Sequence, residues 1–128
     1  MHPWAQAGAV NREEIARQNY ITYSKSSVTF RLTQEYFQKE DLVLNTVIEL
    51  GSMEATKELV KLGLGICILA PWVARKEIRE GSLIGLPLGR RKLTRRWGIL
   101  QWRGKRLSLA EETFIGLCEQ ATSGLTAN

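Results

Sequence analysis

Residues 49–71 read ELGSMEATKELVKLGLGICILAP, and this stretch decides the fold. The apolar, β-branched run at residues 42–50 ends within this stretch. Gly51 breaks that run, and Ser52 can cap the helix that follows. The Gly-Leu-Gly at 63–65 ends the helix, because glycine accepts the left-handed turn that helix ends often need. The apolar run at 66–69 then predicts a strand buried on both faces, as in parallel sheets. Strand, helix and strand in this order predict a right-handed crossover.

The same alternation continues on both sides of this stretch. Stretches rich in aromatic, β-branched or continuous apolar residues predict strands at residues 19–24, 42–50, 66–69, 83–88 and 96–102. Capping residues and apolar stripes predict helices at residues 12–19, 28–39, 53–62, 71–80 and 109–121. Alternating strands and helices indicate an α/β fold built around a mostly parallel sheet flanked by helices.

Length and composition exclude several classes of protein. The chain has 128 residues, which suits one domain or one lobe of a larger domain. A hydrophobic content of 44% and a charged content of 24% fit a globular protein. No apolar run approaches the ~20 residues of a membrane-spanning helix, and the N-terminus does not read as a signal peptide. Two cysteines give neither a disulfide framework nor a metal-binding spacing, so we expect a cytoplasmic protein.

The net charge of +5 is concentrated in one block. Residues 75–106 carry 11 of the 18 basic side chains and two of the 13 acidic ones. Such a block can neutralise nucleic-acid phosphates, draw an anionic ligand toward the protein, or remain a solvated surface. Because side chains of a strand alternate between faces, these cations need not form one patch. The cations in question are Arg90, Arg91, Lys92, Arg95, Arg96, Arg103, Lys105 and Arg106.

Six segments, taken in order along the chain, resemble the effector-binding domain of LysR-type transcriptional regulators. The most specific is the 49–71 stretch, with its serine-led helix, Gly-x-Gly-Ile and closing proline. The full set is His2-Pro3-Trp4-Ala5, Ile21-Thr22-Tyr23-Ser24 with Ser27 and Tyr36-Phe37, Glu49 to Ala55, Leu59 to Pro71, Glu77 to Leu83, and Ser108 to Phe114. Together they cover about nine tenths of the chain.

The resemblance implies a single lobe of a type 2 periplasmic-binding-protein-like fold. We expect residues 1–18 to be a crossover segment and short helix, 19–122 to be mainly the second lobe, and 123–128 to be a frayed tail. The family's winged helix-turn-helix, linker helix and most of the first lobe would lie before Met1. On this interpretation the chain itself has no DNA-binding domain.

The implied function is sensing of a small-molecule effector, of anionic chemistry, within a bacterial transcriptional regulator. The implied partners are that effector, a second copy in a homodimer or homotetramer, and DNA only through the absent N-terminal domain. No cofactor and no membrane contact are implied. Two alternatives remain open from the residues: a small basic nucleic-acid-binding module, and a vestigial fragment without function.

The candidate effector site lies at the carboxyl ends of the strands, where ligands of such sheets bind. Bare helix amides and the helix dipole favour an anion at these corners, and serine hydroxyls add donors. Plain helix capping is an equal explanation for each serine. In the family these strand ends face the cleft, and the residues that the resemblance places there are Ser24, Ser26, Ser27, Gly51, Ser52, Met53 and Pro71.

The remaining reactive side chains do not form a catalytic or metal site. His2 is the only histidine and has no cluster of ligands around it in the sequence. Cys67 lies in an apolar run and Cys118 on a helix face, so both are expected to be small buried hydrophobes. Trp4, Trp97 and Trp102 are expected to anchor a core or an interface. We therefore expect no enzymatic activity.

Overall fold

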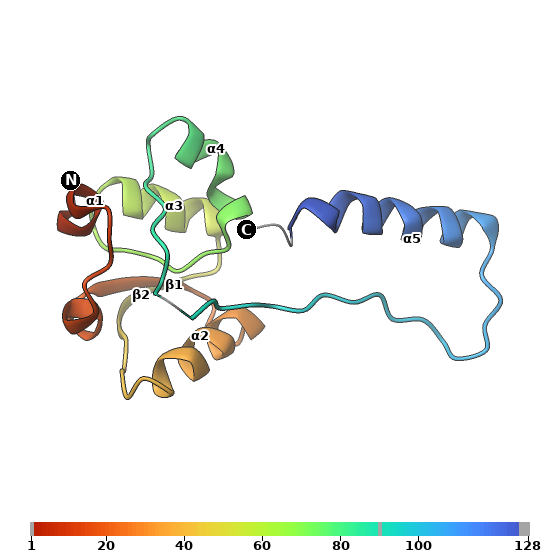
Figure 1. The fold of residues 1–128 in the computed structure, drawn as a ribbon, viewed down its shortest axis with the longest axis horizontal. Helices are drawn as coiled ribbons and strands as arrows, with labels where there is room; N and C mark the ends of the chain where they lie inside the picture. The colour runs from red at the N-terminus through yellow and green to blue at the C-terminus, as the bar shows by residue number, and fades with distance from the viewer. Residues whose placement is uncertain (1, 90, 126–128) are drawn as a thin grey trace. The chain divides into compact units, whose positions relative to one another are not determined.

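The computed structural model describes residues 2–89 and 91–125, and it divides the chain into two compact units, residues 1–95 and 96–128 (Figure 1). The helices and strands of the first unit are α1 (Pro3–Ala7), η1 (Arg12–Arg17), β1 (Asn19–Tyr23), α2 (Val28–Gln38), β2 (Asn45–Leu50), α3 (Met53–Lys61), η2 (Pro71–Ala74) and α4 (Arg75–Arg79). Those of the second unit are α5 (Leu109–Thr122) and η3 (Ser123–Leu125). The elements labelled η are 3₁₀-helices.

A parallel pair of strands forms the centre of the first unit. β1 and β2 pair so that Tyr23 lies opposite Leu50, with a register shift after Tyr20. The helices α2 and α3 lie on opposite sides of this pair (Figure 1). The α/β class with a parallel sheet is thereby confirmed, and the carboxyl ends of both strands meet at one edge.

Local signals predicted most of the helices and both strands. Ser27, Ser52 and Ser108 are the N-caps of α2, α3 and α5. The sequence predicted Ser52 and Ser108 as caps and left either Ser26 or Ser27 as the cap of α2. β1 spans all but the last residue of its predicted range, whereas β2 begins only at Asn45. The helix predicted at 71–80 divides at Ala74, where η2 passes into α4.

Three predicted strands are wrong. The 66–69 segment makes a single β-bridge, in which the Ile66 amide donates to the Asn19 carbonyl at 2.9 Å and the Ile21 amide donates to the Ile66 carbonyl at 2.8 Å. The segments at 83–88 and 96–102 form no strand. A strand needs a paired neighbour to satisfy its amides and carbonyls, and the sheet in the described part of the chain contains only β1 and β2.

The core of the first unit is aromatic. Its buried members are Trp4, Ile15, Tyr20, Tyr36 and Phe37. Trp4 enters this core from α1, a helix that the sequence analysis treated as crossover segment. Proline at the first helical position was the available signal for α1. The expected anchoring role of Trp4 is confirmed, and its indole also donates a hydrogen bond of 2.9 Å to Glu14.

The second unit lacks buried side chains on its helix. No residue of α5 is buried, and Phe114 is 65% exposed. Trp97 and Trp102 are 68% and 83% exposed, so the described structure does not place them in a core. Ser108 and Glu111 form a reciprocal capping box, and Lys105 pairs with Glu111. The Lys105 and Ser108 hydrogen bonds lower the pKa of Glu111 to about 2.

Ser108→Ala is expected to fray the start of α5. The substitution removes the hydroxyl that accepts from the Glu111 amide, and losing such a cap costs about 1 kcal/mol. Hydrogen exchange of the first α5 amides should therefore speed up about fivefold. Thr113→Ala is the control, because the Thr113 hydroxyl only returns to the Leu109 carbonyl within the helix. Equal exchange in the two variants would show that the box contributes nothing to the helix.

Candidate functional site

The first corner of the candidate site connects β1 to α2. The Ser27 hydroxyl oxygen accepts the Phe30 amide at 3.1 Å, which is the capping geometry that the sequence left open. The Ser24 and Ser26 hydroxyls lie 2.7 Å apart, and the Ser27 amide donates to the Ser24 carbonyl at 2.9 Å. The three serines are thus brought together in one turn, with Ser27 in the capping role.

The second corner connects β2 to α3. The Ser52 hydroxyl accepts the Ala55 amide at 3.3 Å, so this serine is also a helix cap. The Thr56 hydroxyl donates to the Ser52 carbonyl at 3.0 Å and is fully buried. Gly51 is exposed, and an added Cβ there would meet no atom within 4 Å. The turn is therefore well fixed on its helix side and open on the other.

The parallel register brings the two corners to the same edge of the sheet. Tyr23 and Leu50 are paired, and each is the last residue of its strand. Glu49 joins the corners, because its carboxylate accepts the Lys25 amide at 2.7 Å. The sequence analysis missed this carboxylate. An anion at the first corner must therefore avoid Glu49 or displace it from the Lys25 amide.

A surface hollow lies at the start of α2. Ser26 and Ser27 line it together with Val28, Phe30 and Gln34. The side chains of Lys25 and Arg31 also line it, and they pair with Glu49 and Glu35. The hollow does not include Gly51, Ser52, Met53 or Pro71. The structure thus groups Ser26 and Ser27 with two basic side chains and keeps Ser24 and the other candidates outside that hollow.

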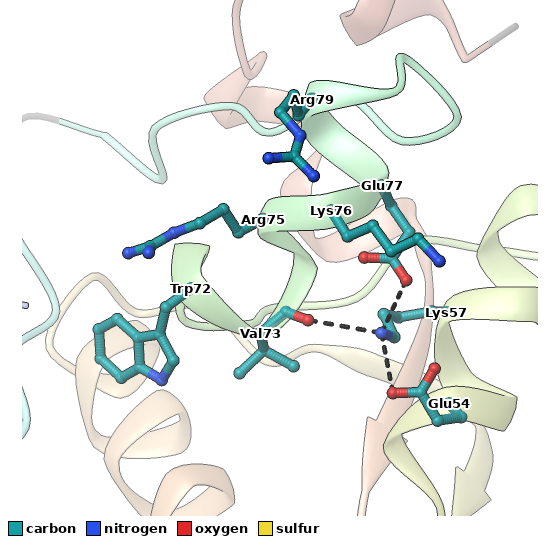
Figure 2. Close-up of a pocket in the computed structure, with 8 residues that line it drawn as sticks. All are labelled: Glu54, Lys57, Trp72, Val73, Arg75, Lys76, Glu77 and Arg79. Atoms are coloured by element: carbon teal, nitrogen blue, oxygen red, sulfur yellow. Dashed lines mark hydrogen bonds and ion pairs between the residues drawn. The ribbon is translucent and has the colours of Figure 1, made fainter.

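The last candidate residue, Pro71, is the first residue of η2 and begins what we call the Pro71 turn. A buried ion pair between Lys57 and Glu77 connects α3 to the segment that follows this turn. Lys57 lies one turn into α3, and its ammonium donates to the Val73 carbonyl at 3.4 Å and to Glu77 at 2.8 Å (Figure 2). A second contact joins the same ammonium to Glu54 at 2.9 Å. Lys57 and Glu77 are only 5% and 6% exposed. These residues line a hollow that Trp72 and the basic side chains of α4 also border.

This ion pair keeps both partners charged. The hydrogen bonds that Lys57 donates to Glu77 and then to Glu54 raise the pKa of Lys57 above its usual value. The Lys57 hydrogen bond lowers the pKa of Glu77. The sequence analysis missed the pair, because the partners are 20 residues apart and belong to different helices. The available signal was a lysine in the middle of an otherwise half-buried helix face.

The basic block is partly used within the first unit. Arg91 stacks 4.1 Å from the Tyr36 ring centroid and pairs with Glu40 at 3.2 Å. The Tyr36 hydroxyl donates in return to the Arg91 carbonyl at 2.7 Å. Arg95 donates to the Thr29 hydroxyl at 3.0 Å. These two arginines hold the 91–95 segment against α2, which the sequence did not predict; Arg90 lies outside the described residues.

The two cysteines, Cys67 and Cys118, are partly buried rather than fully buried as expected. Burial raises the pKa of the Cys67 thiol to about 11, which disfavours its reactive thiolate form. Among the described residues, no cluster of three or more histidine, cysteine or acidic side chains could hold a metal ion. In the same part of the chain, no helix has the length and apolar character needed to cross a membrane.

The sequence profile of the LysR substrate binding domain matches residues 1–123. The chain belongs to this family. Similar proteins include the HTH-type transcriptional activator CmpR of Synechocystis and the RuBisCO operon transcriptional regulator of Acidithiobacillus ferrooxidans, each 30% identical over 114 residues. The HTH-type transcriptional regulator CfxR of Cupriavidus necator is 28% identical over 112 residues. These are transcriptional regulators rather than enzymes by name.

This chain of the LysR substrate-binding domain family spans less than two fifths of the length of those relatives. The matches cover 89% of this chain but 38% of CmpR and 37% of the Acidithiobacillus protein. The family resemblance stated from the motifs is thereby confirmed, and a match of that length is consistent with a C-terminal part. The roles of the seven candidate effector-binding residues stay predictions.

Proposed function

We propose that this chain senses a small anionic effector as part of a LysR-type transcriptional regulator. The observation that carries the proposal is the parallel pairing of β1 with β2. This pairing brings two serine-capped helix starts to one edge of the sheet. Helix starts present bare amides and positive dipole ends, and both favour an anion. Lys25 and Arg31 lie beside the first corner, where Glu49 and Glu35 pair with them.

The assembly around this site is part of the same proposal. Residues 19–122 act mainly as the second lobe, residues 1–18 as the crossover and residues 123–128 as a tail. The effector contacts Ser24, Ser26, Ser27, Gly51, Ser52, Met53 and Pro71, and a first lobe closes over it. The regulator works in the cytoplasm as a homodimer or homotetramer. Ligand binding favours one of two lobe arrangements, and this difference in affinity drives the DNA-binding part.

A ligand-dependent thermal melt tests the proposal. The 128-residue chain is melted with sulfate, phosphate and a panel of small carboxylates. One anion should raise the melting temperature, and the gain should grow with the logarithm of its concentration once the site is saturated. The double variant Ser27→Ala/Ser52→Ala should lose most of this gain relative to its own ligand-free melt. Ser108→Ala is the matched control, because it also loses a helix cap but retains both corners.

The outcomes separate the proposal from its alternatives. A full anion response in the Ser27→Ala/Ser52→Ala variant would remove both serines from the site. A cooperative melt that no anion moves would contradict anion binding by this chain. The absence of a cooperative transition would favour a vestigial fragment.

Nucleic-acid binding is the second candidate, and the exposed basic residues of the 96–106 segment favour it. Arg96, Arg103 and Arg106 are all exposed in the second unit. If this hypothesis holds, the chain should bind any duplex DNA, and its affinity for DNA should fall steeply as the salt concentration rises. Fluorescence anisotropy with random duplexes at low and high salt distinguishes the two functions, because effector sensing by this chain predicts no such binding.

A further inference from the structure

The Lys57 ammonium lies where three elements of the first unit meet. It is on α3, and its contacts are Glu54 of the same helix, the Val73 carbonyl of η2 and Glu77 of α4 (Figure 2). An ammonium group has three donors, and these three acceptors match them in number. The geometry of α3 against η2 and α4 therefore depends on one side chain.

The buried position of Lys57 and Glu77 makes their contact costly to break. Burying a charge is costly unless the charge is paired and hydrogen-bonded. Glu77 is 6% exposed, and within the described part of the chain its Oε2 atom has no hydrogen-bond partner. The Glu77 carboxylate therefore relies on its bond to Lys57. A shift of α3 away from α4 would leave the Glu77 carboxylate buried without its partner, whereas Lys57 would retain Glu54 of its own helix.

The contacts of Lys57 also connect two parts of the candidate effector site, the Ser52 corner and the Pro71 turn. Lys57 is five residues beyond Ser52 on α3, and Val73 is two residues beyond Pro71 in η2. Ser52 caps the helix that carries Lys57, and the Val73 amide donates to the Ala70 carbonyl at 3.0 Å, which closes the turn around Pro71. A displacement of the ammonium would therefore move the Ser52 corner relative to the Pro71 turn.

We propose that Lys57 is a positioning residue that holds the Ser52 corner and the Pro71 turn at the spacing that an effector needs. It does not touch the effector itself. This inference rests on the proposed function, because it assigns the Ser52 corner and the Pro71 turn to one binding site. The contrary view is that the pair only stabilises the fold.

The variants separate positioning from stability. Lys57→Met alone leaves the Glu77 carboxylate buried without its partner, so a loss of folding there would be uninformative. Lys57→Met/Glu77→Leu removes both charges and replaces them with apolar volume, an exchange that often preserves stability. Lys57→Arg keeps the charge but presents a longer planar group. Lys61→Met is the matched control, because Lys61 pairs with Glu58 on the exposed face of the same helix.

Two measurements decide the role of Lys57. The first is hydrogen exchange of the Val73 amide, with the Phe30 amide of the first corner as internal reference. The second is the affinity for inorganic phosphate by calorimetry. In the folded double variant we expect Val73 exchange to rise and phosphate affinity to fall, each by roughly tenfold, which lies within the usual range for coupling between sites. Phe30 exchange, and all values of Lys61→Met, should match wild type.

The Val73 exchange rate and the phosphate affinity of the double variant decide whether the proposal holds. A double variant with wild-type Val73 exchange overturns the proposal, as does one with wild-type phosphate affinity where wild type binds phosphate. If wild type binds no phosphate, phosphate is excluded as the effector, and Val73 exchange still decides the positioning role. If the double variant does not fold, Lys57→Arg is measured instead, and wild-type values for both readouts would overturn the proposal.

Discussion

Phe37→Ala is expected to be the most destabilising single substitution that this structure predicts. Phe37 is 1% exposed in the aromatic core and meets the Tyr36 ring edge to face at 5.1 Å between centroids. Removing a buried phenyl ring leaves a cavity and costs about 3–5 kcal/mol of unfolding free energy. Small domains have only about 5–15 kcal/mol in total, so a large unfolded fraction is expected. Urea unfolding followed by tryptophan fluorescence measures the change, because Trp4 lies in the same core.

Phe114→Ala is the matched control for this prediction. Phe114 is 65% exposed on α5, so its replacement should change the unfolding free energy by less than about 0.5 kcal/mol. Equal losses in the two variants would contradict the described burial. They would mean that α5 packs against something in solution as closely as α2 packs against the core.

The sequence predicted those features that a few neighbouring residues determine. A serine at the N-cap accepts a free amide at the start of a helix, and Ser27, Ser52 and Ser108 all do so. β1 was recognisable because it is rich in aromatic and β-branched residues. The meeting of the two serine corners also followed, since parallel strands place their carboxyl ends at one edge.

Features that depend on distant partners could not be read in the same way. The run at 96–102 has the composition of a strand, yet composition cannot supply the neighbour that a strand requires. Glu49 lies near Lys25 only because β1 and β2 adopt one particular register. The Lys57–Glu77 pair needs two helices to pack, and it appears in the sequence only as two ordinary charged residues. The missed parts of the candidate site are those made by tertiary contact.

Gly65→Ala is expected to have the second largest effect, because this glycine sits against β1. An added Cβ would lie 2.6 Å from the Asn19 carbonyl oxygen and 3.1 Å from the Ile21 side chain. The nearest atom belongs to the backbone, so a change of rotamer cannot relieve the clash. The same carbonyl accepts the Ile66 amide at 2.9 Å, so relief requires breaking the β-bridge. Overpacking of this kind costs about 1–3 kcal/mol or more.

Urea unfolding and hydrogen exchange of the Ile21 amide together test the Gly65 prediction. The Ile21 amide donates to the Ile66 carbonyl, so its exchange should accelerate as the bridge opens. Gly51→Ala is the control for stability, because an added Cβ there meets no atom within 4 Å. If the two variants were equally stable, the chain at Gly65 could not lie against β1 in solution. The isolated bridge between Ile66 and β1 would then not form in solution.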